Sequence, residues 1–497
     1  MDSLDETSPR PEGAPVDLSR RRLALALPAA GLAQALPAAA APGKPNIVFV
    51  VADDLDYELH THMAQLRALV TDQGVQFMNH FVSLSLCGPS RATMLRGQFG
   101  KSTGIVDNQG PYGGFEKFFL DGLESSTYAT WLKAAGYRTA LMGKYLNTYP
   151  SPESGPLYVP PGWDTWFVPN GGNEYGQYNY SVNDNGVALS FGSAAADHFH
   201  DVMQARAVRF LREAAAAPDG KPFLLVVTPF LPHGPTIPPP RYKPLFPGVK
   251  APRPPNYNEA DVSDKPGWLR SLPLLNETAM KRIDAQYRHR RQCAQALDDL
   301  MAALVNTLAE TGTLSNTYVF FTSDNGYFNG EHRIPSNKTR PYEESIRIPL
   351  VARGPGIPAG RQVRALTANV DVASTLAELG GARPAGFVDG RSLVPYLRGQ
   401  APARWRRSLL LESQPPEVNG RWQSYRGLRT ADDKVLVLWN YGFGEYYDLR
   451  VDPYQMVNTF KTMPATLKSQ LTQQLRLLQT RRIAGMRAAE EVAAWET

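Results

Sequence analysis

The stretch Asn46-Ile47-Val48-Phe49-Val50-Val51-Ala52, followed by Asp53-Asp54, indicates the fold of this chain. The run is almost continuously apolar and rich in β-branched residues, which is typical of a strand buried on both faces of a parallel sheet. Ligands of such sheets collect beyond the carboxyl ends of the strands. Because Asp53 and Asp54 stand at such an end, we expect them to contribute to a functional site.

Strand and helix patterns alternate along the chain up to about residue 400. We expect further buried strands at residues 139–142, 223–228 and 318–322, and helices at 127–135, 197–217, 276–310 and 371–379. Such alternation predicts an α/β fold with a large, mostly parallel sheet flanked by helices. We assign residues 45–400 to this domain.

The pattern changes beyond residue 400. Strand-like runs occur at 408–412, 422–430, 434–439 and 445–449, and a long helical pattern covers 465–494. Neighbouring strands without intervening helices indicate an antiparallel sheet. The sequence therefore predicts a smaller α+β subdomain over residues 401–497.

Composition excludes several classes of protein. The 497 residues are 43% hydrophobic and 20% charged, which is ordinary for a globular chain and too apolar for a disordered one. A net charge of +5 spread over this length is no nucleic-acid footprint. No segment after the N-terminal region has the ~18 consecutive apolar residues that a membrane span needs. Of the two cysteines, Cys293 lies in a helical pattern and is expected to be a small core residue.

The N-terminal region has the features of a targeting segment. Arg20-Arg21-Arg22 precedes an apolar Ala/Leu run that ends near Ala41. A basic segment, a short apolar segment and Ala-rich cleavage options describe a secretory signal, and paired arginines suggest the twin-arginine route. We therefore expect residues 1–41 to be a signal peptide and the protein to be secreted, periplasmic or bound at the cell surface. A disordered cytosolic tail is the alternative.

Two long segments, residues 148–192 and 229–275, are rich in Gly, Pro, Asn or Tyr. Long loops over an α/β sheet usually shape a binding cleft. Aromatic residues such as Trp163, Trp166 and Tyr175 recur in the first of them. Such side chains stack on sugar faces and on aryl rings alike, so they leave the ligand class open.

A second polar group follows the strand expected at 318–322. Ser323-Asp324-Asn325-Gly326 there resembles Asp53-Asp54 in its position at a strand end. Three carboxylates and one carboxamide would form an all-oxygen shell, which suits Ca²⁺ or Mg²⁺. Either group alone is more typical of a helix cap or a turn than of a metal site. Together, at two strand ends of one sheet, they favour a metal site.

The segment from Cys87 to Gly97 carries a resemblance to a known family. Cys87-Gly88-Pro89-Ser90-Arg91, followed by Leu95-x-Gly97, resembles the signature of the type I sulfatases. Other blocks agree in order along the chain: Gly143-Lys144-Tyr145-Leu146-Asn147, Pro232-His233-Gly234-Pro235, residues 322–326, Lys338, and residues 445–449 with Asp452-Pro453. The resemblance therefore covers most of the chain and implies an alkaline-phosphatase-like fold.

Within that family, three stretches are most similar to the N-acetylglucosamine-6-sulfatases and the extracellular glucosamine-6-endosulfatases. They are GKYLN at residues 143–147, the loop at 160–186 and the segment at 314–357. Many other sulfatases have a histidine where this chain has Leu146. That departure puts in doubt a second histidine beside the nucleophile, and Asn147 is the candidate substitute.

The resemblance also implies the roles of individual residues. Cys87 would be oxidised to formylglycine (3-oxoalanine) by a formylglycine-generating enzyme, and the hydrated aldehyde would attack sulfur. The implied ligands of Ca²⁺, with Mg²⁺ as the alternative, are Asp53, Asp54, residue 87, Asp324 and Asn325. Arg91 would donate to the hydrate and to the carboxylates, and Lys144 and Lys338 would bind sulfate oxygens. His233 would protonate the leaving oxygen, because histidine titrates near pH 6.5, and His332 is a rival for this role.

The expected function is hydrolysis of a sulfate ester in a sulfated sugar, with 6-O-sulfated N-acetylglucosamine as the substrate and glycosaminoglycan degradation as the context. An arylsulfatase of broad specificity is one alternative. A phosphoester hydrolase of the same fold is another, although such enzymes usually bind two zinc ions through several histidines and this chain has 8 histidines without a cluster. A calcium-dependent glycan-binding protein on an inactive scaffold is the third. None of these readings needs nucleic acid or a membrane span.

Overall fold

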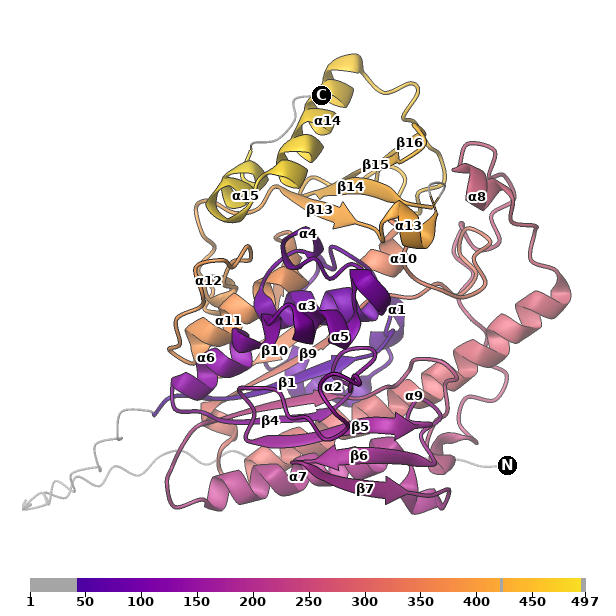
Figure 1. The fold of residues 1–497 in the computed structure, drawn as a ribbon. Coiled ribbons are helices and arrows are strands. Elements are labelled where there is room, and N and C mark those ends of the chain that lie inside the picture. The colour runs from indigo at the N-terminus through magenta and orange to yellow at the C-terminus, as the bar shows by residue number, and fades with distance from the viewer. Residues whose placement is uncertain (1–42, 421–422, 493–497) are drawn as a thin grey trace, which may run out of the picture. The chain divides into compact units, whose positions relative to one another are not determined.

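The computed structural model describes residues 43–420 and 423–492, so the expected signal peptide lies outside the described residues. A ten-stranded sheet forms the centre of the larger part (Figure 1). Its order is β11 (Arg361–Val363), β2 (Val75–Phe77), β10 (Leu350–Arg353), β9 (Thr317–Ser323), β1 (Asn46–Ala52), β8 (Phe223–Thr228), β4 (Arg138–Gly143), β5 (Thr165–Gly172), β6 (Tyr180–Asp184) and β7 (Val187–Phe191). The five strands from β9 to β5 run parallel, as predicted.

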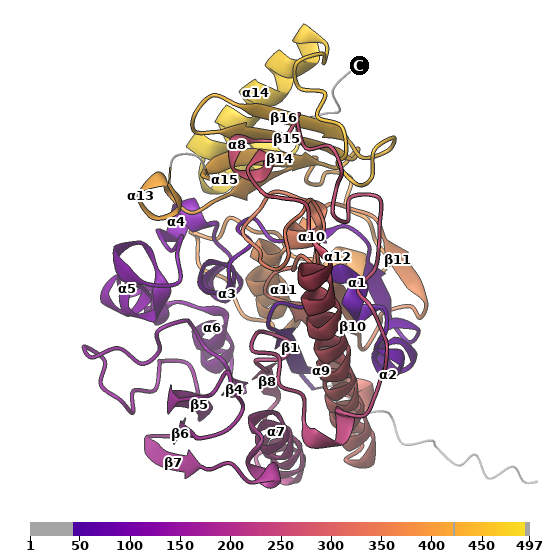
Figure 2. The ribbon, with the colours of Figure 1, turned by 90° about the vertical axis from the view of Figure 1, so that its right-hand side faces the viewer.

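Helices cover both faces of this sheet (Figures 1 and 2). The even-numbered residues of β1 pack on α7 (Phe199–Ala216) and α9 (Glu277–Glu310) in one apolar cluster. The odd-numbered residues pack on the other face with α3 (Cys87–Arg96), α6 (Tyr128–Ala134) and α11 (Val372–Leu379). A strand buried on both faces explains why its sequence is continuously apolar rather than alternating. Cys293 is fully buried in α9, as expected.

A separate sheet of four antiparallel strands follows. Its strands are β13 (Ser408–Glu412), β14 (Tyr425–Thr430), β15 (Lys434–Trp439) and β16 (Gly444–Asp448), in sequence order. The antiparallel sheet expected after residue 400 is therefore confirmed, while the domain boundary itself stays a prediction. The shorter elements are α1 (Tyr57–His60), α2 (Ala64–Leu66), β3 (His80–Phe81), α4 (Gly100–Thr103), α5 (Gly114–Leu120), α8 (Gly267–Arg270), α10 (Glu343–Ile346), β12 (Thr367–Ala368), α12 (Val394–Leu397) and α13 (Pro416–Asn419).

The single helix predicted at 465–494 is wrong. The chain forms α14 (Ala465–Thr480), then a break, then α15 (Ile483–Glu490). Lys101 Nζ donates to the carbonyl of Arg481 at 2.6 Å and also to the carbonyl of Leu478, so it binds carbonyl groups at the end of α14. Ile483 has a left-handed φ of 50°, which redirects the chain into α15. A distant lysine and a tertiary turn thus end a helix whose local sequence would continue.

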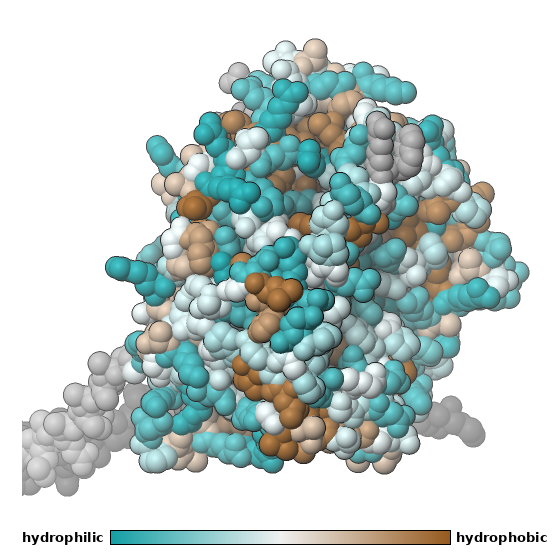
Figure 3. All heavy atoms as spheres, viewed as in Figure 1, coloured by the Kyte–Doolittle hydropathy of each residue, from teal (hydrophilic) through white to brown (hydrophobic). Residues whose placement is uncertain are grey.

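The surface in view in Figure 3 is mostly hydrophilic, with hydrophobic residues in small separate groups. Among the described residues, no helix combines the length and the apolar character needed to cross a bilayer.

Candidate active site

The two acidic strand ends meet at one edge of the large sheet. β1 and β9 are parallel neighbours, and Ala52 pairs with Ser323, so the residues that follow each strand lie side by side. The backbone N–H of Asp54 donates to Asp324 Oδ1 at 3.0 Å, and Asn325 Nδ2 donates to Asp54 Oδ1 at 2.7 Å. All four polar residues, Asp53 included, are buried. The prediction that the two groups come together is confirmed.

Asp54 adopts a backbone conformation that is uncommon for a residue other than glycine. Its φ is 63°, in the left-handed region. Arg290 Nη2, on α9, donates to the carbonyl oxygen of Asp54 at 2.7 Å and to Asp56 Oδ2 at 2.6 Å. Arg290 is fully buried. It therefore supports the turn that aims the Asp54 carboxylate into the site.

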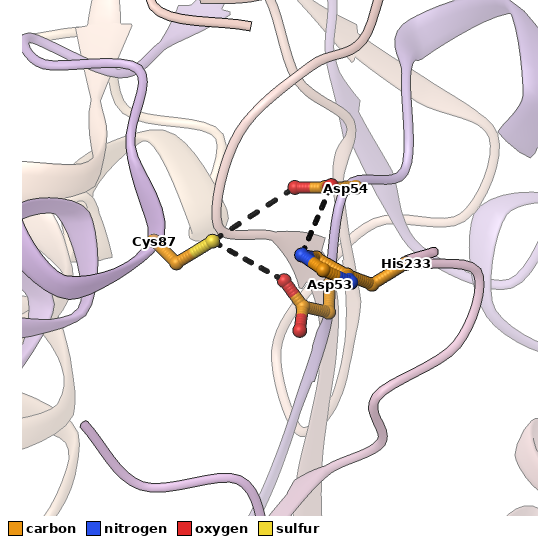
Figure 4. Close-up of side chains that lie close together, drawn as sticks. All are labelled: Asp53, Asp54, Cys87 and His233. Carbon is orange, nitrogen blue, oxygen red and sulfur yellow. Dashed lines mark hydrogen bonds and ion pairs between the residues drawn. The ribbon is translucent and has the colours of Figure 1, made fainter. Parts of the chain in front are cut away.

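Cys87 begins α3 and faces the aspartates (Figure 4). Its Sγ lies 3.5 Å from Asp53 Oδ1, 3.9 Å from Asp54 Oδ1 and 2.8 Å from Lys338 Nζ. Asn108 Oδ1 accepts from the N–H of Gly88 at 2.7 Å, which satisfies one of the free donors in the first turn of the helix. Burial raises the pKa of the Cys87 thiol to about 12, so the unmodified side chain is neutral at pH 7.

Three buried cations face the three carboxylates. Lys144 Nζ lies 2.7 Å from Asp53 Oδ2, Arg91 Nε lies 2.9 Å from Asp324 Oδ2, and Lys338 Nζ forms an ion pair with Asp54. Burial alone would raise the pKa of Asp53, but Lys144 and the other neighbouring cations outweigh it and hold this pKa below its ordinary value. All the predicted cationic site residues are thus brought into one cluster.

His233 is the histidine that reaches this cluster. Its Nε2 lies 3.6 Å from Asp54 Oδ2, and its Nδ1 lies 2.6 Å from the carbonyl oxygen of Gly234 (Figure 4). The ring of Tyr175 packs against it with 4.8 Å between the ring centroids. His233 therefore has one ring nitrogen fixed by its own loop and the other directed at the carboxylates.

His332, the rival for the same role, makes different contacts. It is fully buried, with Nδ1 2.6 Å from Glu259 Oε2 and Nε2 3.2 Å from Asn256 Nδ2. Both ring nitrogens are therefore engaged by residues outside the cluster. The geometry favours His233 over His332 as a proton donor at the site.

The side chains at this edge fit a hard divalent cation. One ligand atom each of Asp53, Asp54, Cys87 and His233 lies within 4.8 Å of the others. Asn325 Oδ1 is buried and has no hydrogen-bond partner among the described residues. An orphaned buried acceptor is costly, and a metal ion beside the three carboxylates would satisfy it. Carboxylate and amide oxygens are the ligands that Ca²⁺ and Mg²⁺ prefer.

Two of the aromatic residues expected to stack on a ligand lie elsewhere. Trp163 and Trp166 are buried in the hydrophobic core, and Trp166 Nε1 donates to the hydroxyl of Tyr149 at 2.8 Å. The expectation that these two line the binding cleft is therefore wrong, because their rings pack against Tyr128, Tyr145 and Tyr149 in the core. Tyr175 does lie at the site, since Lys144 Nζ is 5.3 Å from its ring centroid.

Leu146, which stands where many other sulfatases have a histidine, lies in the core. Leu146 is 3% exposed and packs in the core, so it offers no group to the reaction. The backbone carbonyl of Asn147 accepts from the N–H of Phe115 at 2.7 Å, and its buried Oδ1 has no hydrogen-bond partner within the described part of the chain. The structure gives no contact between Asn147 and Cys87, so its part in catalysis stays a prediction.

Comparison with known proteins adds the family. A family model described as Sulfatase matches residues 45–382, and a second, described as N-sulphoglucosamine sulphohydrolase, C-terminal, matches residues 330–481. The chain belongs to the sulfatase family. It is therefore a hydrolase of sulfate esters with the alkaline-phosphatase-like fold that the sequence predicted. The Cys87, Asp53 and Asp54 cluster lies within the first matched region.

Individual relatives resemble the chain over most of its length. The N-acetylglucosamine-6-sulfatase of Homo sapiens is 31% identical over 485 residues, which cover 89% of this chain and 86% of that protein. An arylsulfatase of Volvox carteri is also 31% identical, over 92% of this chain and 78% of its own length. Among solved structures, BT4656 in complex with its substrate D-glucosamine-2-N,6-O-disulfate has a TM-score of 0.72 and 25% identity, over 88% of this chain and 98% of that one.

Proposed function

We propose that this sulfatase removes the 6-O-sulfate from N-acetylglucosamine residues of sulfated glycans. The observation that carries the proposal is the 31% identity to an N-acetylglucosamine-6-sulfatase over 89% of the chain. A 6-O-sulfated glucosamine is also the substrate of the structurally similar BT4656. The arylsulfatase relative of comparable identity supports an alternative, a broad arylsulfatase.

Residue 87 is the proposed nucleophile, in the form of formylglycine. When hydrated, this aldehyde supplies two geminal hydroxyls, one to attack sulfur and one to release sulfate from the protein. The position of Cys87 supports this role, since Asp53 Oδ1 at 3.5 Å can accept a proton from a group placed there. A neutral thiol buried among carboxylates would be a poor nucleophile by comparison.

Asp53, Asp54, Asp324 and Asn325 would hold Ca²⁺, or Mg²⁺ in its place, together with residue 87. A bound cation of this kind lowers the pKa of a coordinated hydroxyl and offsets the charge of the sulfate group. The fully buried Asp324 contacts Arg91, whose Nη1 also donates to the carbonyl of Lys144 at 3.1 Å. Arg91 thereby ties the ligand carboxylates to the segment that carries Lys144.

The remaining roles fall to side chains around the nucleophile. Lys144 and Lys338 are buried ammonium groups that would neutralise the sulfate oxygens, as preorganised charges do where negative charge develops. His233 would donate a proton to the oxygen of the departing alcohol. Its Nε2 is the ring nitrogen directed at the cluster.

The proposed regiospecificity follows from the shape of the substrate. A primary 6-O-sulfate projects from the sugar on a CH₂ arm, so it can reach a buried charged cluster while the ring stays outside. Tyr175, which contacts both His233 and Lys144, is the aromatic residue placed to pack against that ring. Tyr175 thereby takes the role of packing against the sugar, which was also expected of Trp163 and Trp166 before these two were found in the core.

We also propose that the protein is exported by means of residues 1–41, and that a formylglycine-generating enzyme is its partner during maturation. Both follow from the motifs at Arg20–Arg22 and at Cys87. Fusion of residues 1–45 to a reporter, followed by fractionation, tests export. A matched fusion with the three arginines replaced by glutamine should stay in the cytoplasm.

A comparison of kcat/KM on regioisomers tests the substrate assignment. The purified protein should hydrolyse N-acetylglucosamine 6-sulfate faster than the 3-sulfate, glucosamine 2-N-sulfate, an aryl sulfate and an aryl phosphate. Equal values for the sugar regioisomers, or a strong preference for the aryl sulfate, would remove the glycan assignment and leave a sulfatase. Preference for the phosphate would favour the phosphoester alternative.

A further inference from the structure

A buried side chain of α9 contacts both segments that carry the proposed metal ligands. Arg290 Nη2 donates to the carbonyl oxygen of Asp54, in the segment after β1, at 2.7 Å. The same guanidinium lies over the ring of Tyr327, 4.1 Å from its centroid. Tyr327 follows Asn325 by two residues and so belongs to the segment after β9. Arg290 therefore connects the two strand ends, which are far apart in the sequence.

Two neighbouring residues of α9 fix the same segments. Gln286 Nε2 donates to the hydroxyl of Tyr327 at 2.8 Å, and the hydroxyl of Tyr287 donates to Glu58 Oε2 at 2.7 Å. Residues three and four apart are neighbours on a helix surface, so Gln286, Tyr287 and Arg290 share one side of α9. This helix of 34 residues packs along its length on the large sheet. Both segments are thus attached to one rigid element.

Asp56 completes the connection between the segments. Its Oδ2 accepts from Arg290 Nη2 at 2.6 Å, and the side-chain amide of Asn329, in the second segment, lies 3.5 Å from the same oxygen. Its Oδ1 accepts from the N–H of Leu59 at 2.8 Å at the start of α1. The carboxylate pairs with the fully buried guanidinium, so Arg290 is not an uncompensated charge beside the ligand cluster. Its effect on a cation must therefore come through the positions of the ligands.

The ligand Asp54 needs such support. Its φ of 63° is an uncommon conformation, which persists only where the surrounding structure enforces it. Its Oδ1 accepts from Asn325 Nδ2 at 2.7 Å, so a shift of either segment changes the spacing between these two ligands. A site binds its metal tightly when the ligands are already oriented by their outer contacts.

We propose that Arg290 is a positioning residue that sets the affinity of the active site for its divalent cation. The inference rests on the proposed metal ligands. One planar guanidinium binds the carbonyl of Asp54 and Asp56 and stacks on Tyr327 at the same time. A lysine keeps the charge but has no plane to stack, and it is a more strongly hydrated point charge.

Cation binding by Arg290→Lys tests this inference. Isothermal titration calorimetry gives the Kd of Ca²⁺ for the metal-stripped parent and variant, and activity is measured against Ca²⁺ concentration in parallel. The variant should bind Ca²⁺ about 10- to 100-fold more weakly, the loss typical of residues that orient metal ligands. At saturating Ca²⁺ its kcat and its KM for the sulfate ester should return close to those of the parent, because excess cation offsets a weaker site.

Arg291→Lys is the matched control. Arg291 is the next residue of α9, and its guanidinium also lies over an aromatic ring, that of Phe246, at 4.8 Å from the centroid. The replacement removes the same group and keeps the same charge, but Phe246 belongs to neither ligand-bearing segment. The Kd of Ca²⁺ should stay at the parent value. An unchanged Kd in Arg290→Lys, or equal losses in the two variants, would overturn the inference.

A second variant covers the case in which Arg290→Lys does not fold. Tyr327→Leu keeps the buried ion pair and removes the stacked ring, and it should weaken Ca²⁺ binding by about two- to tenfold. Thermal unfolding of the metal-free proteins establishes that each variant is folded at the titration temperature. An unchanged Kd in folded Tyr327→Leu would contradict the inference. A parent that binds neither Ca²⁺ nor Mg²⁺ would instead overturn the ligand assignment on which the inference rests.

Discussion

Replacement of His233 by alanine should slow the reaction in proportion to how poor the leaving group is. In the structure, one ring nitrogen is 2.6 Å from the carbonyl of Gly234, and the other is directed at the carboxylate cluster, 3.6 Å from Asp54. A sugar alcohol leaves as an unstable alkoxide unless it receives a proton, and a positioned general acid contributes about 10²- to 10⁴-fold. That range corresponds to roughly 3–5 kcal/mol of barrier. A nitrophenyl sulfate leaves as a stabilised phenolate and should lose less than about tenfold.

Single-turnover or steady-state kcat on the two substrates, with parent and His233→Ala, measures this contrast. The control is His332→Gln, which removes the rival histidine. Since His332 is buried between Glu259 and Asn256, its replacement should lower the unfolding temperature without changing the ratio of the two kcat values. Equal losses on sugar and nitrophenyl substrates in His233→Ala would refute proton donation. A selective loss in His332→Gln would move the role to that residue.

Further predictions concern the nucleophile, the metal and one buried carboxyl group. Cys87→Ala should reduce turnover below about a hundredth of the parent's value without changing the unfolding temperature. In the parent protein, the peptide that contains residue 87 should be about 18 Da lighter than the same peptide with an unmodified cysteine. EDTA should inactivate the enzyme, and Ca²⁺ or Mg²⁺, but not Zn²⁺, should restore its activity. Asp324→Ala should lose both metal affinity and activity. Full activity of a protein in which elemental analysis finds no metal would contradict this prediction. Burial raises the pKa of Glu124 from 4.5 to about 7, so the native state keeps a proton that the unfolded chain releases, and stability falls as pH rises through that window. The change in the free energy of unfolding from parent to Glu124→Gln should therefore be more favourable at pH 8 than at pH 5, by on the order of 3 kcal/mol. The same change at both pH values would count against this prediction.

The sequence predicted those parts of the fold that depend on local pattern. The apolar run of β1 and the long periodic pattern of α9 were visible because burial on both faces, or along one stripe, leaves a direct signature. The strands β5 to β7 were missed, since Gly, Asn and Pro within residues 165–191 are depleted in strands and read as loop. The break after Thr480 was missed for another reason: Lys101, far away in sequence, binds the carbonyl groups there.

The site, too, contains residues that the sequence predicted and residues that it did not. Asp53, Asp54, Asp324 and Asn325 could be placed together because parallel strand ends meet at one sheet edge. Arg290 was not singled out from the sequence, although its spacing from Tyr287 and Ala294 puts it on the buried stripe of α9. No linear signal separates the buried Trp163 and Trp166 from the site residue Tyr175, because all three stand in one aromatic-rich segment.

The charges of the cluster explain why cation and sulfate belong together at this site. Asp53, Asp54 and Asp324 are balanced by Arg91, Lys144 and Lys338, so the side chains alone sum to zero. Burial raises the pKa of Asp324, and the like charge of the adjacent Asp53 raises it further. A divalent cation held there would relieve that repulsion and would leave a surplus of two positive charges beside residue 87. Such a surplus would offset the two negative charges of the sulfate ion released on hydrolysis.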